Sequence, residues 1–304
     1  MLDPEFVLDD AAQDRIISRF GDGARTWCAE LPERVERCCV RWDLRLEQAQ
    51  TGSTSRVYLG SRGDGTEVVL KVTPEPPIAR AEAAALRAWA GRPHAVKLLD
   101  AEPEDGVLLL ERLRPGTTLR DAGGPPPARE LAELLTSLRA PGTGDLTGPL
   151  PTLSQRVDFI FHLIGKRLAS PRVAALVRPE LVTVAHQRAR DLARGGPTAL
   201  VHGDLHFANI LVAEPPRRLV AIDPRPCLGD PTFDAVDWAL APTHRVALGQ
   251  LDRHIAGICA LVPQLDPGRL WSWCQASAVI IVVQHLHRRP ADETIPPLLE
   301  LAGR

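Results

Sequence analysis

The 304-residue sequence has few aromatic residues, no long apolar run and no excess of one charge, and each lack excludes a class of protein. Aromatic residues make up 4% of the chain, with a single tyrosine, so a surface that stacks nucleic-acid bases is not expected. No apolar run approaches the roughly 18–20 residues that cross a bilayer. The formal net charge is −2, which gives no overall attraction to nucleic acid or anionic membranes. We therefore expect no nucleic-acid partner and no membrane, and the sequence gives no sign of an obligatory protein partner.

The six cysteines also lack a functional spacing. None of them belongs to a C-x-x-C pair, and the N-terminus has no basic segment leading into an apolar one. We therefore expect reduced, buried thiols in a soluble cytoplasmic protein. Residues 3–6, Asp-Pro-Glu-Phe, resemble a cloning-linker remnant and are left out of the fold prediction.

What is present is the composition of an ordinary globular protein, with 44% hydrophobic and 24% charged residues. Short β-type runs dominate residues 42–113, beginning with an alternation over 42–47 and including Glu67–Val72. One helix is predicted there, over Ile78–Ala90. Beyond Arg114-Pro115-Gly116 helical spacing prevails. The predicted helices cover 129–138, 153–170, 173–194, 233–241, 250–261 and 270–287.

The densest group of polar residues follows a buried-type strand over 199–201. The chain continues His-Gly-Asp-Leu-His-Phe-Ala-Asn, which contains Asp204 and Asn209. A predicted hairpin over 210–222 then leads to Asp223. The ends of these strands would place the three side chains around one point.

This set of residues suits phosphoryl transfer. The reaction needs a carboxylate that orients the attacking hydroxyl group and accepts its proton, and oxygen ligands for Mg²⁺, which bridges the phosphates. We predict that Asp204 is the catalytic base and that Asn209 and Asp223 are the magnesium ligands.

Other polar residues near this stretch have less specific roles. We expect His202, Asp230 and Asp234 to support the catalytic loop, with His202 bonding loop main chain. His206, Asp237 and Trp238 are candidates for contact with the acceptor. An alternative from another class is a metal-dependent hydrolase that uses His202, Asp204, His206 and Asp223, but this leaves Asn209 and Lys71 without a role.

The motif H-G-D-x-x-x-x-N, followed by Ile222-Asp223-Pro224, resembles the aminoglycoside phosphotransferase family, which is related to the protein kinases. The match is closer to its streptomycin 6-phosphotransferase and hydroxyurea phosphotransferase branch, through Ile222–Pro226, Gly229–Asp234 and Leu109–Leu113. The resemblance implies an α+β, two-lobed protein-kinase-like fold. A small N-terminal lobe, residues 1–112, would hold an antiparallel sheet and one helix. Residues 113–304 would form a larger, mainly helical lobe, with nucleotide bound between the two.

The same resemblance implies further nucleotide-binding residues. Lys71 matches the lysine that binds the α- and β-phosphates, and Glu82 matches its ion-pair partner. Glu111 to Leu113 match the hinge that meets the purine. The phosphate-loop position has only one glycine, so the hydroxyl groups of Ser53, Thr54 and Ser55 are the candidates there.

The implied reaction moves the γ-phosphoryl group of ATP, or of GTP, with Mg²⁺ onto a hydroxyl group of a small molecule. An aminoglycoside such as streptomycin is the leading candidate for the acceptor, and hydroxyurea or another metabolite alcohol is the alternative. A polycationic acceptor needs carboxylates. The second half of the chain offers Asp158, Glu180, Asp234, Asp237 and Asp252.

Overall fold

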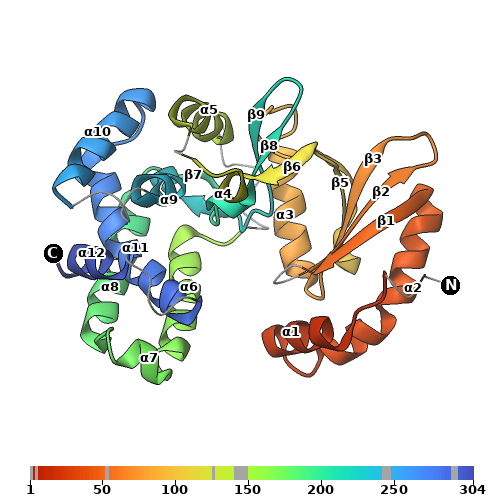
Figure 1. Cartoon of the computed structure of the whole chain (residues 1–304), viewed down its shortest axis with the longest axis horizontal. Helices are drawn as coiled ribbons and strands as arrows, with labels where there is room; N and C mark the ends of the chain where they lie inside the picture. The colour runs from red at the N-terminus through yellow and green to blue at the C-terminus, as the bar shows by residue number, and fades with distance from the viewer. Residues whose placement is uncertain are drawn as a thin grey trace. The chain divides into compact units, whose positions relative to one another are not determined.

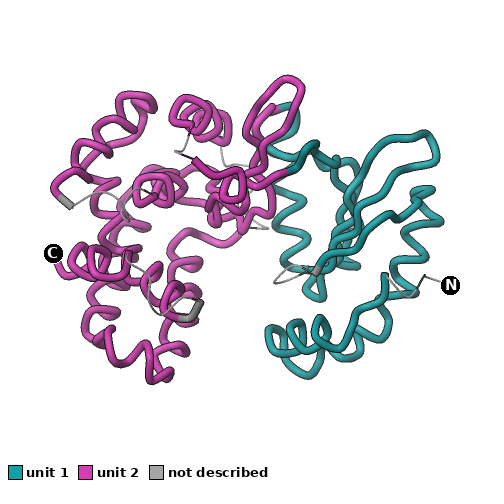
Figure 2. Tube along the Cα trace, viewed as in Figure 1, with its two compact units in different colours: residues 1–91, 95–116 teal, residues 92–94, 117–304 magenta. Residues whose placement is uncertain are grey.

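Figure 1 shows a computed structural model of the chain, which describes residues 3, 6–51, 55–124, 127–139, 150–241, 248–288 and 294–304. The chain divides into two compact units (Figure 2). Unit 1 consists of Met1–Gly91 and Ala95–Gly116, and unit 2 consists of Arg92–His94 and Thr117–Arg304.

Unit 1 is built on a five-stranded antiparallel sheet in the order β1-β2-β3-β5-β4 (Figure 1). The strands are β1 (Leu44–Thr51), β2 (Arg56–Arg62), β3 (Glu67–Val72), β4 (Leu98–Glu102) and β5 (Val107–Glu111). β3 has the bounds that its β-branched run predicted. Successive side chains alternate between faces, so Val68, Leu70 and Val72 enter one core while Lys71 faces the other side of the sheet.

Two helices precede the sheet and cover one of its faces: α1 (Asp10–Phe20) and α2 (Ala24–Trp42). Ile16, Leu31 and Val35 are at most 1% exposed and belong to the same core as the β3 side chains. The strand predicted from residue 42 starts later, because Trp42 ends α2 and Asp43 caps it with a left-handed φ of 51°.

Phe6 belongs to the fold, so leaving it out of the fold prediction was wrong. Its side chain is buried in the core of unit 1. Its carbonyl oxygen accepts a hydrogen bond from the Tyr58 hydroxyl group at 3.2 Å. The single tyrosine is therefore a core residue.

The predicted helix of unit 1 is α3 (Pro76–Ala88), which is followed by β4 and by the short 3₁₀ helix η2 (Pro103–Asp105). α3 begins with Pro76 and Pro77, which suit the first turn because its N–H groups have no partner within the helix. This helix carries Glu82 toward Lys71.

Helices make up most of unit 2. They are α4 (Leu119–Ala122), α5 (Ala128–Leu138), α6 (Leu153–Arg167), α7 (Pro171–Ala174), α8 (Pro179–Gly195), α9 (Val236–Leu240), α10 (Leu251–Leu261), α11 (Pro267–Arg288) and α12 (Ile295–Gly303). The long α11 packs against α6, α8, α9, α10 and α12 and forms the centre of the unit. Trp273 and Val279 on α11 are fully buried.

Two predicted helices are divided in the structure. The span 173–194 breaks into α7 and α8 because Pro179 disfavours a helical conformation at Arg178, whose ψ is 138°. The span 233–241 is a 3₁₀ helix, η5 (Pro231–Ala235), followed by α9.

Short strands hold the catalytic-loop region of unit 2. β7 (Ala199–Val201) pairs with β10 (Cys227–Gly229), a strand that the sequence analysis did not predict. The predicted hairpin is present as β8 (Ile210–Ala213) and β9 (Arg218–Ala221). They form a three-stranded sheet with β6 (Pro115–Thr118), where the chain passes from unit 1 into unit 2.

Within the described residues, no helix has both the length and the apolar character to cross a membrane. Cys28, Cys38, Cys227 and Cys274 are buried free thiols. Burial raises the pKa of Cys38 to about 12, so this thiol stays protonated.

Candidate active site

Unit 1 holds a buried ion pair between β3 and α3. Lys71 Nζ lies 2.8 Å from Glu82 Oε1 and 2.6 Å from Oε2, and the two residues are 6% and 1% exposed. The three prolines between them do not prevent the pairing, because Pro74 lies in the connection between β3 and α3, and Pro76 and Pro77 form the start of the helix. A lysine ammonium group is thereby kept at a defined place on the sheet.

We expect Glu82→Gln to lower the free energy of unfolding by about 3 kcal/mol, because it removes the carboxylate charge from a buried ion pair. Denaturant unfolding followed by fluorescence measures this loss. Glu104→Gln is the matched control, since it removes an exposed pair with Arg80 and should cost under about 1 kcal/mol. An equal effect of the two substitutions would contradict the structural role of the buried pair.

The other predicted nucleotide residues of unit 1 are only partly placed. Ser53 and Thr54 lie outside the described residues, and Ser55 is buried directly before β2. Glu111 ends β5, and its main-chain N–H donates to Lys97 O at 3.0 Å. Leu113 follows two residues later, so the hinge prediction concerns a segment at the end of a central strand.

In unit 2 the segment between β7 and β8 presents Asp204. Its side chain is 36% exposed, and its main-chain oxygen accepts from His206 N at 3.0 Å. The 3₁₀ helix η4 (Phe207–Asn209) then turns the chain into β8. Asp204 is thus a solvent-accessible carboxylate on a loop that is closed by its own hydrogen bonds.

Asn209 and Asp223 are brought together by the β8–β9 hairpin. Ile222 N donates to Asn209 O at 2.9 Å, so the residues that follow β9 lie beside Asn209. Asn209 Nδ2 donates to Asp204 O at 3.0 Å, which leaves Oδ1 as the amide atom that suits a metal ion. Asp223 adopts a left-handed φ of 52°, a conformation that aspartate tolerates better than most residues and that is common at functional sites.

Asp234 is attached to the main chain of the catalytic loop. Its two carboxylate oxygens accept from His202 N at 2.7 Å and from Gly203 N at 2.9 Å. Burial raises the pKa of Asp234 to about 7, although both N–H groups favour the ionised form. A Cβ on Gly203, whose φ is 74°, would overlap Arg225 O, so this turn requires glycine.

Asp230 is fully buried and connects the same region to α11. It accepts hydrogen bonds from Trp273 Nε1 at 2.6 Å, from Thr232 N at 2.9 Å and from Arg269 Nε. The structure therefore places Asp230 and Asp234 as acceptors for groups of the surrounding fold.

His202 is also fully buried, and its Nε2 lies 3.1 Å from Ile222 O. Among the described residues, no group of three or more His, Cys, Asp and Glu side chains is arranged to hold a metal ion. The histidine lies inside the loop that it was predicted to support.

The acceptor candidates differ in exposure. His206 is 44% exposed, and its Nε2 lies 4.0 Å from Asp204 Oδ2. Desolvation raises the pKa of Asp237 to about 6; Asp204 adds to the shift and His206 opposes it. Asp237 therefore lies in the electrostatic field of the loop. Trp238 is 3% exposed, and its contact with an acceptor stays a prediction.

The sequence analysis did not identify Arg156, which contacts the catalytic loop from α6. Its Nη2 lies 3.5 Å from Asp204 Oδ1, and its Nε and Nη2 each donate to Gly203 O at 3.3 Å. Arg156 belongs to no motif and lies far from Asp204 in sequence. Only the packing of α6 brings it to the loop.

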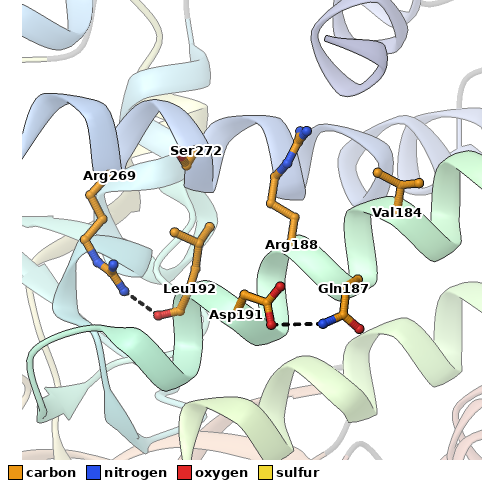
Figure 3. Close-up of a pocket in the computed structure, with 7 residues that line it drawn as sticks. All are labelled: Val184, Gln187, Arg188, Asp191, Leu192, Arg269 and Ser272. Atoms are coloured by element: carbon orange, nitrogen blue, oxygen red, sulfur yellow. Dashed lines mark hydrogen bonds between the residues drawn. The ribbon is translucent and has the colours of Figure 1, made fainter.

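A surface depression lies between α8 and α11 (Figure 3). It is lined by Val184, Gln187, Arg188, Asp191, Leu192, Arg269 and Ser272. None of the predicted site residues lines it. Arg269 connects this depression to the region of the catalytic loop, because it donates hydrogen bonds both to Asp230 and to Leu192 O.

Comparisons with known proteins agree on a family. The family model described as aminoglycoside/hydroxyurea antibiotic resistance kinase matches residues 41–287. The streptomycin 6-kinase of Streptomyces griseus is 33% identical over 268 residues, which cover 84% of this chain and 83% of that protein. The hydroxyurea phosphotransferase of Kitasatospora aureofaciens is 36% identical over 228 residues, 71% of this chain and 63% of that protein.

The fold has solved counterparts. The choline kinase LicA from Streptococcus pneumoniae aligns with a TM-score of 0.60 at 11% identity, covering 90% of this chain and 99% of that one. Likeness at such low identity concerns the fold alone and confirms the predicted kinase-like fold. The family model matches most of the chain, and the fold has a sheet-containing unit followed by a mainly helical one. This chain therefore belongs to the aminoglycoside/hydroxyurea antibiotic resistance kinase family.

Proposed function

We propose that this protein transfers the γ-phosphoryl group of ATP to a hydroxyl group of streptomycin or a closely similar aminoglycoside. The observation that carries the proposal is the half-exposed Asp204 carboxylate, held next to Asn209 by the turn that also brings in Asp223. A streptomycin 6-kinase is among the similar proteins. Resistance to the antibiotic would be the biological result.

In the proposed reaction Asp204 accepts the proton of the acceptor hydroxyl group as its oxygen attacks the γ-phosphorus in line with the leaving β-phosphate oxygen. The half-exposed carboxylate suits this role because an acceptor can reach it, while the closed loop keeps its position. Lys71 would bind α- and β-phosphate oxygens, and Glu82 would keep its ammonium group in place.

Asn209 and Asp223 fit a magnesium ion chemically. They supply one amide oxygen and one carboxylate, and Mg²⁺ in nucleotide sites takes one or two carboxylates together with phosphate oxygens and water. When bound there, Mg²⁺ would supply positive charge that offsets the charge developing in the transition state. Asn209 has its Nδ2 directed to Asp204 O, which suits ligation through Oδ1.

Two of the carboxylates considered for binding a cationic acceptor already have partners within unit 2. Asp158 pairs with His186 at 2.8 Å and Arg190 at 3.1 Å, and Asp234 is occupied by the loop N–H groups. Glu180 and Asp252 are exposed in the first turns of α8 and α10. Asp237 is the carboxylate of this set whose charge interacts with both Asp204 and His206, which supports a role in acceptor binding.

A coupled assay of nucleotide turnover, with Mg²⁺ and a panel of aminoglycosides, hydroxyurea and simple sugars, tests the proposal. We expect turnover that depends on streptomycin and on ATP, with GTP measured in parallel. Turnover with hydroxyurea alone would select the second candidate, which the 36% identity to a hydroxyurea phosphotransferase favours. No turnover with any acceptor would overturn the proposed acceptor class.

The hydrolase alternative requires His202 as a metal ligand. Its side chain is fully buried and its Nε2 contacts Ile222 O, whereas the kinase mechanism needs His202 only as a loop support. The same assay separates the two, because a hydrolase would turn over its substrate without nucleotide.

We expect Asp237→Asn to raise the KM for streptomycin about tenfold at pH 7.5, the effect of losing one charge-assisted contact. The KM for ATP should not change. Because the pKa of Asp237 is raised to about 6, its ionised form prevails above pH 6. The wild-type KM for streptomycin should therefore rise as the pH falls through 6, and the variant should lack this component.

Steady-state kinetics between pH 5 and 8 measure this, and Asp252→Asn is the matched control because Asp252 is an exposed carboxylate of α10. A variant with wild-type KM at pH 7.5 would remove Asp237 from acceptor binding.

A further inference from the structure

The first turn of α6 carries a cation to the catalytic loop. Arg156 is 15% exposed, and its guanidinium group reaches two successive residues of the loop. Nε and Nη2 share Gly203 O at 3.3 Å each, and Nη2 lies 3.5 Å from Asp204 Oδ1. One side chain thus contacts both the main chain before Asp204 and the Asp204 carboxylate.

The start of α6 is itself attached to the strands that hold the loop. Thr152 and Gln155 form a capping box, with Thr152 N donating to Gln155 Oε1 at 2.8 Å. Leu228 N, in β10, donates to Pro151 O at 2.9 Å. A Cβ on Gly229 would overlap Leu153, so this glycine permits the close approach of α6 to β10. The position of Arg156 is therefore set by the same strand pair, β10 and β7, that leads into the loop.

The Gly203 residue is held from both sides. Its N–H donates to Asp234 Oδ1 at 2.9 Å, and its carbonyl oxygen accepts from Arg156. The peptide plane between Gly203 and Asp204 includes that carbonyl oxygen, so a bond to it orients the Asp204 main chain. The hydrogen bond from Gly203 N to Asp234 holds the peptide group before Gly203. The Gly203–Asp204 peptide group is held by Arg156.

The two oxygens of Asp204 have different neighbours. Oδ1 faces Arg156, whereas Oδ2 lies 3.4 Å from Asn209 Nδ2 and 4.0 Å from His206 Nε2. The guanidinium group of Arg156, which is 15% exposed, therefore lies on the Oδ1 side. An approaching hydroxyl group therefore meets a carboxylate whose orientation is already set by Oδ1.

We propose that Arg156 is a positioning residue for the catalytic base: it holds the Gly203–Asp204 peptide and Asp204 Oδ1, so that Oδ2 accepts the proton of the acceptor hydroxyl group. This inference rests on the proposed phosphotransfer at Asp204. It adds a residue from α6 to the predicted site, and it explains why a guanidinium group that is only 15% exposed points at a partly exposed carboxylate.

The packing of Arg156 supports this orientation. The Phe159 ring, one turn further along α6, has its centroid 6.0 Å from the Arg156 guanidinium carbon. A ring face at that distance favours a cation beside it. Arg156 is thereby confined between α6 and the loop, as a residue that orients a carboxylate must be.

The test compares Arg156→Ala, Arg156→Lys and the control Lys166→Ala, which removes an exposed cation from the same helix. Turnover is measured with ATP, Mg²⁺ and the acceptor that supports wild-type activity, with and without added methylguanidinium. Thermal unfolding and ATP binding are measured on each variant. We expect kcat of Arg156→Ala to fall about 100-fold, the loss typical of a reacting group misplaced by about 1 Å.

The remaining readouts separate positioning from simple support of the fold. ATP binding should be retained in Arg156→Ala, and methylguanidinium should restore part of its kcat but not change that of Lys166→Ala. Arg156→Lys should lie between wild type and Arg156→Ala, because an ammonium group keeps the charge but not the forked donor geometry.

Wild-type kcat in Arg156→Ala would overturn the inference while leaving the proposed function in place. A loss of activity in Arg156→Ala that is matched by loss of ATP binding, and that methylguanidinium does not rescue, would also overturn the inference. Absence of acceptor-dependent turnover in the wild-type protein would instead overturn the proposed function and, with it, this inference.

Discussion

Replacing Asp204 with asparagine should lower kcat by about 1000-fold or more, because a positioned general base contributes about 10²–10⁴-fold to the rate. Asparagine is nearly isosteric and keeps an oxygen toward the loop donors, but it cannot accept the hydroxyl proton. Nucleotide binding should be retained, since Asp204 is not one of the proposed magnesium ligands. Acceptor-dependent turnover and equilibrium binding of ATP with Mg²⁺ measure the two effects separately.

Asp191→Asn is a suitable control for this substitution. Asp191 is a carboxylate of α8 that bonds Gln187 at 2.9 Å, so its loss changes the charge of unit 2 without touching the loop. Turnover of Asp204→Asn close to that of Asp191→Asn would refute the assignment of the base.

The second large effect is expected at Asp223. Asp223→Asn keeps a residue that tolerates the left-handed φ of 52°, so the change is chiefly the loss of the carboxylate charge. We expect affinity for Mg²⁺ with ATP to fall by about 10- to 100-fold, the range seen even when only a partner of a metal ligand is removed. kcat/KM for ATP should fall at least as much.

Titration of nucleotide binding against Mg²⁺ concentration gives the measurement, and higher Mg²⁺ should recover part of the loss. Arg225, whose Nη2 lies 3.8 Å from Asp223 Oδ1, would lose this ionic contact in the variant. Thermal unfolding therefore accompanies the assay. A folded variant with unchanged dependence on Mg²⁺ would remove Asp223 from the metal site.

Local sequence signals were sufficient for much of unit 2's loop region. The runs before Asp204 and around Asn209 predicted β7, β8 and β9, because a hairpin is closed by residues that are neighbours in the chain. The spacing from Asp204 to Asn209 spans one tight turn, and the hairpin then returns Asp223 to Asn209. β3 and its lysine were predicted for the same reason, since a β-branched run bounded by a turn is a local signal.

The mistakes arose where the partner of an apolar face is distant in sequence. The sequence analysis did not identify α1 and α2 as part of the core of unit 1, and it left Phe6 out of the fold. The burial of Trp238, which is 3% exposed, could not be read from its place near a helix start either. Periodicity identifies a face that must be covered, and says nothing of which segment covers it.

By itself the sequence determined the family, and it predicted candidates for the base, the metal ligands and the phosphate-binding lysine, because each is carried by a short motif. The tertiary structure gave the contacts of two predicted supports, Glu82 with Lys71 and Asp234 with the loop main chain, and it alone placed Arg156 beside Asp204. Glu82 could be anticipated by resemblance, whereas Arg156 could not. Its contact depends on the close approach of α6 to β10 at Gly229, and such packing between distant segments leaves no pattern in one sequence.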